Sequence, residues 1–280
     1  MSARLRGIAK ETQRIVVQGW YHTPAGREVS VREGVRRARQ LTRLYGPEPV
    51  EVPAVAPTAS PTTFEVTQEG SLEAARRLAD APVAVLDFAS ARNPGGGYLN
   101  GAQAQEEALC RASALYTCLR EAPDYYAAHR ADRSPFYTDR VIHSPAVPVF
   151  RDDQGALLEA PFTVGFLASP APNAGVIACQ LPGETGRIAD VLRRRAERVL
   201  EVAALHGYRR LALGAWGCGV FQNDPALVAS AFATHLTGGG RFADRFTHVV
   251  FAVLDRRPDS PARTAFAEAF TDGRVEVPAR

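Results

Sequence analysis

The chain has 280 residues, 46% of them hydrophobic, so it can bury one large core or two modest ones. Its net charge of +3 is compatible with a polyanionic substrate without demanding one, and it gives no reason to expect nucleic-acid binding. No apolar run approaches membrane-spanning length and the N-terminus has no hydrophobic signal core, so we expect a cytoplasmic α/β protein that does not bind membranes.

The four cysteines argue against a metal site. They show no CxxC or Cys–His spacing, which zinc sites need. We therefore expect reduced cysteines that pack in the core, as is usual in a reducing compartment.

The first 60 residues predict a helical extension. Residues 1–18 predict a basic helix, residues 28–31 a short extended piece, and residues 32–45 a second helix. The segment 47–61 is too rich in proline for regular structure and predicts a surface connector. This connector divides the N-terminal part from a core expected to span residues 61–280.

The core is predicted to begin with a βαβ unit. Residues 63–67 predict a strand, Ser71 a helix cap, and residues 72–79 a helix. Residues 83–88 then form an apolar run without polar alternation, which is typical of a central parallel strand covered on both faces. Such strands present ligands at their carboxyl ends.

A glycine loop follows this strand. Three consecutive glycines, Gly95, Gly96 and Gly97, remove every Cβ, so backbone N–H groups can approach an anionic or sugar ligand. Apolar residues at helical spacing then predict one helix over residues 105–120, and its first turn carries Glu106 and Glu107.

The second half of the chain predicts a similar strand, loop and helix. Residues 217–221 form a second glycine loop, after a strand predicted at 211–216 and before a helix capped by Asp224. Residues 193–195 are expected on a solvated helix face. The other predicted elements are short extended pieces at 141–143, 147–150 and 157–160, strands at 162–168 and 247–254, and helices at 188–205 and 263–270.

Two glycine loops at the carboxyl ends of strands predict a diphosphate site. Neither loop has the lysine of a P-loop, and no GxGxxG joins a strand directly to a helix. Nucleotide hydrolysis and the redox chemistry of a Rossmann dehydrogenase are therefore poorly supported.

The pattern Gly-Gly-Gly, seven residues, Gln-Glu-Glu closely resembles the signature of bacterial-type poly(ADP-ribose) glycohydrolases. The resemblance implies a macrodomain-like three-layer α/β/α sandwich with a mixed central sheet. Residues 10–31 (KETQRIVVQGWYHTPAGREVSV) resemble the N-terminal region of the same family. The resemblance therefore implies that the extension, residues 1–60, is integral to the fold.

The resemblance also implies roles for individual residues. Glu107 would protonate the leaving ribose oxygen and then deprotonate the attacking water, without a metal or a cofactor. Glu106 would bind hydroxyls of the distal ribose, Gln105 would support the site, and Asn93 would contact ribose. The second loop would wrap the pyrophosphate opposite the first, with Phe221 near the distal ribose; it consists of Gly217, Cys218, Gly219, Val220 and Phe221.

Residue-level reasoning limits what the two glutamates can do. Adjacent helical residues point about 100° apart, so Glu106 and Glu107 are not expected to face each other across one bond as an acid and nucleophile pair. A general acid must hold its proton near neutral pH, so Glu107 is expected to act chiefly in the substrate complex, where desolvation and the bound pyrophosphate favour its neutral form. For adenine recognition only Glu69 is a candidate.

We therefore expect a poly(ADP-ribose) glycohydrolase that releases ADP-ribose from polymer on ADP-ribosylated proteins, in a setting such as the DNA damage response. Two alternatives remain: a hydrolase of single ADP-ribose units on proteins, and a non-catalytic ADP-ribose reader. The glutamate pair argues against the reader, because a site for a dianionic ligand gains nothing from two carboxylates. Cleavage from polymer ends or at internal bonds stays open, as does the oligomeric state.

Overall fold

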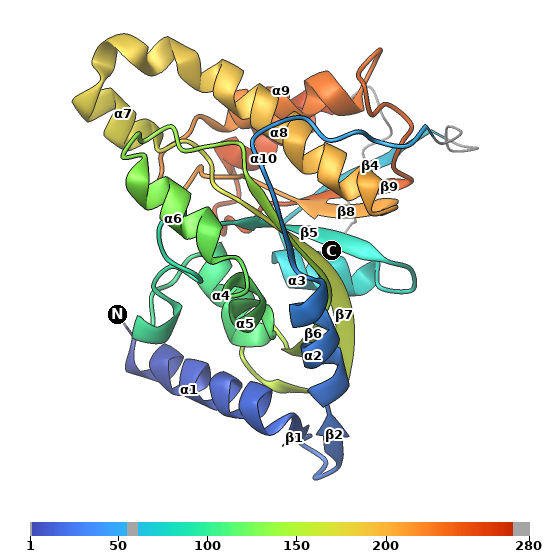
Figure 1. The fold of residues 1–280 in the computed structure, drawn as a ribbon. Helices are drawn as coiled ribbons and strands as arrows, with labels where there is room; N and C mark the ends of the chain where they lie inside the picture. Colours follow the sequence, from blue (N-terminus) through green and yellow to red (C-terminus); the bar gives the residue numbers. More distant parts are fainter. Residues whose placement is uncertain (1, 55–60, 271–280) are drawn as a thin grey trace.

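The computed structural model describes residues 2–54 and 61–270, and within them the centre is a seven-stranded mixed sheet (Figure 1). The strand order is β3-β6-β7-β5-β8-β9-β4. Strand β6 pairs antiparallel with β3 and β7, whereas the other pairings are parallel. The strands are β3 (Arg43–Tyr45), β4 (Thr63–Thr67), β5 (Val83–Phe88), β6 (Val141–Arg151), β7 (Leu157–Ser169), β8 (Arg210–Leu213) and β9 (His248–Ala252).

Helices cover both faces of the sheet, which gives the expected α/β/α sandwich (Figure 1). One face is covered by α1 (Ala3–Gln18), α2 (Arg32–Leu41), α3 (Ser71–Arg77), α4 (Gln105–Ala112), α5 (Leu115–Leu119) and α6 (Pro123–Ala131). The other is covered by α7 (Ala174–Gln180), α8 (Ile188–Leu205), α9 (Pro225–Leu236) and α10 (Pro261–Ala269). No helix in the described part of the chain is long and apolar enough to cross a membrane.

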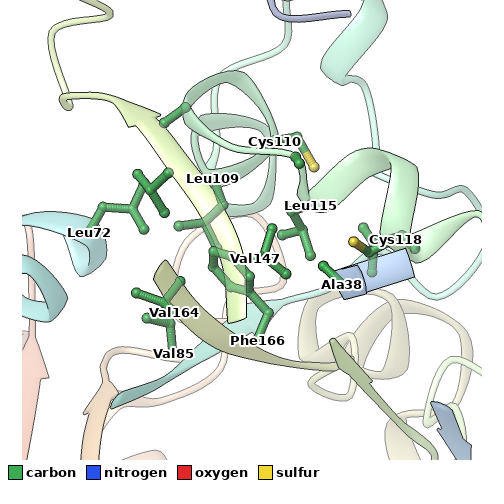
Figure 2. Close-up of a cluster of buried hydrophobic side chains, with 14 of the residues drawn as sticks. Ala38, Leu72, Val85, Leu109, Cys110, Leu115, Cys118, Val147, Val164 and Phe166 are labelled. Carbon is green, nitrogen blue, oxygen red and sulfur yellow. The ribbon is translucent and has the colours of Figure 1, made fainter. Parts of the chain in front are cut away.

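Strand β5 lies in the middle of this sandwich. Val83 and Val85 belong to the hydrophobic core on one face, and Ala84 and Leu86 to the core on the other. Burial on both faces confirms the interpretation of this apolar run as a central strand. Figure 2 shows the first of these cores, in which Leu109 and Leu115 lie close to Val147 of β6.

The N-terminal extension packs on the same core. Helix α1 leads into a small hairpin, β1 (Trp20–His22) and β2 (Glu28–Ser30), and then into α2. The second helix was expected to reach residue 45, but it ends at Leu41 because the next residues form β3 and pair with β6. Of the predicted connector 47–61, residues 55–60 lie outside the described residues.

The helix expected over residues 105–120 is in fact two helices. It breaks at Ser113, whose backbone is extended and pairs with Val149 of β6. The Ser113 hydroxyl donates to the carbonyl of Leu109 (2.7 Å), and the Ala114 N–H donates to the carbonyl of Pro148 (3.1 Å). Pairing with the sheet therefore limits α4 to about two turns.

Several other predictions were wrong in detail. The short extended pieces between 141 and 168 merge into β6 and β7, with a register shift at Ala146, which has φ +46°. Helices α6 and α7 were not predicted, and Ser71 is the first residue of α3 rather than its cap. Arg195 is fully buried instead of solvated, and Cys179 is exposed instead of packed in the core.

Candidate active site

The side chain of Gln105 joins the first turn of α4 to the carboxyl end of β5. Its Oε1 accepts a hydrogen bond from the Phe88 N–H (2.9 Å). Its Nε2 donates to the carbonyl of Leu86 (2.7 Å) and to the hydroxyl of Ser71 (3.1 Å). The amide is thus committed to protein groups, and it sets the position of α4 over the sheet before a ligand binds.

Both carboxylate oxygens of Glu106 bind the backbone of the first glycine loop. Oε2 accepts from the Ser90 N–H (2.8 Å) and Oε1 accepts from the Gly95 N–H (3.2 Å). The side chain is only 3% exposed. Glu106 therefore ties two points of the loop to α4, which leaves only its remaining lone pairs for a ribose hydroxyl.

Glu107 is bound at one oxygen only. Oε1 accepts from the Gly97 N–H (2.9 Å), whereas Oε2 makes no hydrogen bond with the described residues. Gly96 lies between the two carboxylates, because a Cβ placed there would be 2.6 Å from Oε1 of Glu107 and 3.1 Å from Oε2 of Glu106. Adjacent helical residues diverge, but the loop folds over the helix N-terminus so that both side chains reach one glycine.

Sequence analysis missed Asp87, a fully buried carboxyl of β5 near this site. Neither of its oxygens has a hydrogen-bond partner among the described residues. Burial raises the pKa of Asp87 well above its ordinary value, and the charge of Glu107 raises it further. The available signal was a single acidic residue in an otherwise apolar strand, which is costly unless it has a role.

Glu106 lies in the same buried, acidic environment as Asp87. Burial raises the pKa of Glu106 too, the Asp87 charge adds to this, and the N–H groups of Ser90 and Gly95 oppose it. N–H donors favour the charged form of a carboxyl, and among the described residues they reach Glu106 but not Asp87. Of the two carboxyls, Asp87 is therefore the one whose surroundings favour the neutral form more.

The second glycine loop is held by Asn223, another residue that sequence analysis missed. The Asn223 Nδ2 donates to the carbonyls of Pro172 (2.8 Å) and Gly217 (3.2 Å), and the side chain is buried. Gly217 has φ +72°, and a Cβ there would lie 2.5 Å from both Ala171 Cβ and Asn223 Nδ2. Only glycine fits this turn. The Asn223 amide connects the turn to the segment after β7 by hydrogen bonds to both.

The outer part of this loop faces solvent. Val220 at its tip is 79% exposed, and a Cβ at Gly219 would meet no atom of the described residues within 4 Å. Cys218 and Phe221 are half-buried, and the Phe221 ring lies 6.0 Å from that of Tyr137. The loop thus presents backbone and small side chains to a ligand, with aromatic rings at one end.

The structure brings the two loops together at one edge of the sheet. They follow β5 and β8, which are parallel neighbours. The carbonyl of Ser169, at the end of β7, accepts from Ala89 N–H (3.2 Å) and from Trp216 Nε1 (3.0 Å). One carbonyl therefore fixes the start of the first loop relative to the start of the second.

The remaining candidates are less constrained by the fold. Asn93 is exposed on the first loop, and its carbonyl accepts from the Gly96 N–H (3.0 Å). Glu69, the candidate for adenine, is engaged by Arg77 through a 3.1 Å contact from Nε to Oε2. Within residues 2–54 and 61–270, no three His, Cys, Asp or Glu side chains are grouped to hold a metal ion.

Comparisons with known proteins identify relatives that cover most of the chain. The family model for the microbial-type poly(ADP-ribose) glycohydrolase catalytic domain matches residues 9–152, a range that contains Gly96 and Glu107. A structure of poly(ADP-ribose) glycohydrolase from Thermomonospora curvata is 51% identical, covers 96% of this chain and 100% of its own, and has a TM-score of 0.92.

Two further structures carry ligands. The Thermomonospora curvata enzyme bound to the inhibitor ADP-HPD is 50% identical over 96% of this chain and 100% of its own, with a TM-score of 0.87. The Deinococcus radiodurans enzyme in complex with ADP-ribose is 46% identical over 85% of this chain and 98% of its own, with a TM-score of 0.78. Comparison with curated proteins gave no match.

Proposed function

The chain belongs to the microbial-type poly(ADP-ribose) glycohydrolase family, and we propose that Glu107 is the general acid and base of its reaction. The protein is a glycosidase that hydrolyses the ribose–ribose bonds of poly(ADP-ribose) and releases ADP-ribose. The proposed carriers of the polymer are ADP-ribosylated proteins of the cytoplasm.

One asymmetry between the two glutamates supports this assignment. Both oxygens of Glu106 accept from backbone N–H groups, whereas Oε2 of Glu107 has no hydrogen-bond partner among the described residues. A general acid needs an oxygen that can reach the leaving group, so Glu107 is the better candidate. Glu106 then has a positioning role: it holds the first loop and orients the distal ribose.

The proposed reaction uses Glu107 twice. Its proton passes to the leaving ribose oxygen as the glycosidic bond breaks, which leaves an oxocarbenium-like ribose. A water molecule then attacks the anomeric carbon, and the Glu107 carboxylate takes the proton from this water. Proton and charge are balanced at the end of each cycle.

The two glycine loops are proposed to bind the ligand's diphosphate. The backbone near Gly219 is open, since a Cβ there would meet no atom of the described residues within 4 Å. Helices α4 and α9 begin after the two loops, so their N-terminal ends lie next to the loop backbones. Exposed Asn93 is proposed to contact ribose, and half-buried Phe221 is proposed to pack near the distal ribose. Gln105, whose amide is committed to β5 and α3, supports the site without touching the ligand.

The direct test is digestion of poly(ADP-ribose) by the native protein and by Glu107→Gln, with ADP-ribose affinity measured in parallel. Loss of a general acid costs about 10²–10⁴-fold in rate, so the variant should release ADP-ribose at most about 1% as fast. Its affinity for ADP-ribose should be retained, because glutamine keeps the size of the side chain.

Glu33→Gln is the control, since Glu33 is exposed on α2 and should leave the rate unchanged. A native protein that binds ADP-ribose but releases none from polymer would be a reader. Release only from singly modified proteins would indicate the other hydrolase. Full activity of Glu107→Gln would remove Glu107 from the mechanism.

A further inference from the structure

Arg111 lies one helical turn after Glu107 on α4, on the same side of the helix. Its side chain is buried, with 7% exposure, and its Nη1 donates to the carbonyl of Ala102 at 2.7 Å. Ala102 belongs to the segment that connects the first glycine loop to α4. Arg111 therefore spans from the last turn of the helix back to the chain that leads into it.

A chain of hydrogen bonds continues from Ala102 to Glu107. The Ala102 N–H donates to the carbonyl of Gly97 (3.1 Å), and the Gly97 N–H donates to Oε1 of Glu107 (2.9 Å). Ala102 also packs against Gly97, where a Cβ would lie 2.6 Å from the Ala102 methyl group. The hydrogen bonds and the helical turn from Glu107 to Arg111 thus form a closed ring.

Helix α1 and the residue before it form hydrogen bonds with this ring and with the connecting segment. The Thr12 hydroxyl donates to the backbone carbonyl of Arg111 (2.6 Å), and the Tyr98 hydroxyl donates to the carbonyl of Ala9 (3.1 Å). The Ser2 N–H donates to the carbonyl of Gly101 (3.1 Å). The N-terminal extension therefore holds the connecting segment at two points, Tyr98 and Gly101, although Leu99 between them is 49% exposed.

The environment of Arg111 suits a charged side chain. Burial lowers the pKa of Arg111, and the negative charge of Glu107 opposes this, so the guanidinium stays cationic near neutral pH. Its buried position keeps it away from bulk solvent, where a charge would be screened.

We propose that Arg111 is a positioning residue for the hydrolysis: through Ala102 and Gly97 it holds the N–H group that orients the Glu107 carboxylate. The proposal rests on the proposed function of Glu107. Arg111 acts on the geometry of the acid and contributes little to the binding of ADP-ribose, whose diphosphate is bound by the loop backbones.

Two variants test this role against a merely structural one. Arg111→Met removes the donors and the charge, whereas Arg111→Lys keeps the charge and N–H donors on a shorter side chain that lacks the planar guanidinium. A misplaced catalytic group costs up to about 10²-fold, so kcat for poly(ADP-ribose) should fall about 10- to 100-fold in Arg111→Met. Arg111→Lys should lie between this variant and the native protein.

The affinity for ADP-ribose distinguishes a positioning role of Arg111 from a general collapse of the binding site. The Kd for ADP-ribose should stay within about threefold of the native value in both variants, because the loss concerns the transition state. Arg36→Met is the control: Arg36 is exposed on α2 and pairs with Glu33, so kcat should not change. Melting temperatures establish that each variant is folded, and if Arg111→Met does not fold, the kcat-specific loss must still be seen in Arg111→Lys.

Two results would overturn the proposal. One is a folded Arg111→Met with native kcat, and the other is an equal loss of kcat and of ADP-ribose affinity, which would indicate a collapsed cleft. A native protein that releases no ADP-ribose would instead overturn the proposed function, and the role of Arg111 with it.

Discussion

Gly96 packs directly against the Glu107 carboxylate: a Cβ on Gly96 would lie 2.6 Å from Oε1. The backbone of Gly96 also has φ +55°, in the left-handed region that side chains disfavour. The close contact and the positive φ both require glycine at position 96. Packing against the carboxylates is therefore a reason for glycine in the first loop, in addition to the approach of a ligand.

Replacing Gly96 with alanine should therefore displace Glu107 or the loop. We expect kcat for poly(ADP-ribose) to fall about 100-fold or more, because a catalytic group moved by about 1 Å loses that much. The control is Gly26→Ala, since Gly26 also has positive φ, +82°, but has open space around it. It should lower stability by about 1 kcal/mol from backbone strain and leave kcat unchanged. A fully active Gly96→Ala would show that the loop yields without moving Glu107.

Asp87→Asn should change how stability depends on pH. The pKa of Asp87 is raised in the folded protein, so the native state holds a proton that the unfolded state releases above about pH 4. Stability of the native protein then falls as pH rises, by up to about 1.4 kcal/mol per pH unit from this group.

Asparagine has no proton to release, so the free energy of unfolding of Asp87→Asn relative to that of the native protein should grow as pH rises above about 4. Urea unfolding at several pH values measures this difference. A difference between the two proteins that does not vary with pH would contradict a protonated Asp87.

Histidine 129 should make the protein sensitive to acid. His129 Nε2 accepts from the Thr138 N–H (3.1 Å) and Nδ1 donates to the carbonyl of Tyr125 (2.9 Å), which fixes a neutral ring. Burial lowers the pKa of His129 to about 4. Because the unfolded state binds the proton first, stability is fully present above about pH 6.5 and is lost as pH falls towards about 4.

When the pH falls from 7 to 5, protonation of His129 in the unfolded state should lower the free energy of unfolding by about 2 kcal/mol. His129→Gln, which cannot titrate, should lose that much less stability over the same interval in urea unfolding. Equal losses in the two proteins would assign the acid sensitivity to other groups.

Asn223→Asp should loosen the second glycine loop. The Nδ2 donor that bridges Pro172 and Gly217 would become an acceptor facing two carbonyls, at a cost of about 1–3 kcal/mol for the buried groups left unpaired. ADP-ribose binding, measured by calorimetry, should weaken together with thermal stability.

Asn173→Asp is a matched control for this change. Asn173 uses its Oδ1 to accept from the Val176 N–H at the start of α7, and aspartate keeps that acceptor. Its stability should be unchanged or slightly higher. Equal effects of the two substitutions would mean that the Asn223 donor does not hold the loop.

Local patterns in the sequence were sufficient for the elements that carry the site. The apolar run of β5, the three glycines and the acidic first turn of α4 lie within 25 residues of one another, residues 83–107. The start of α9 was equally clear, because Asp224 as cap and Pro225 at the first helical position satisfy a local requirement. Each of these signals depends on neighbours in the chain.

Only the tertiary structure decided the points that depend on distant residues. Helix α4 stops at Ser113 because β6, more than 30 residues later, offers backbone partners at Val149. Arg195 is buried because Asp139 and the carbonyls of Phe136 and Pro170 meet it there. An arginine triplet on a helix has the same appearance in the sequence whether such partners exist or not.

The same distinction applies to the site chemistry. The sequence by itself determined the fold class and the Gln-Glu-Glu motif, since both follow from local pattern and resemblance. Tertiary structure decided the different bonding of Glu106 and Glu107 and the ring through Arg111. It also decided that the buried Asp87 carboxyl has no hydrogen-bond partner among the described residues. Hydrogen bonding and burial fix where charge and protons reside, and both depend on which atoms the fold brings within about 3 Å of each other.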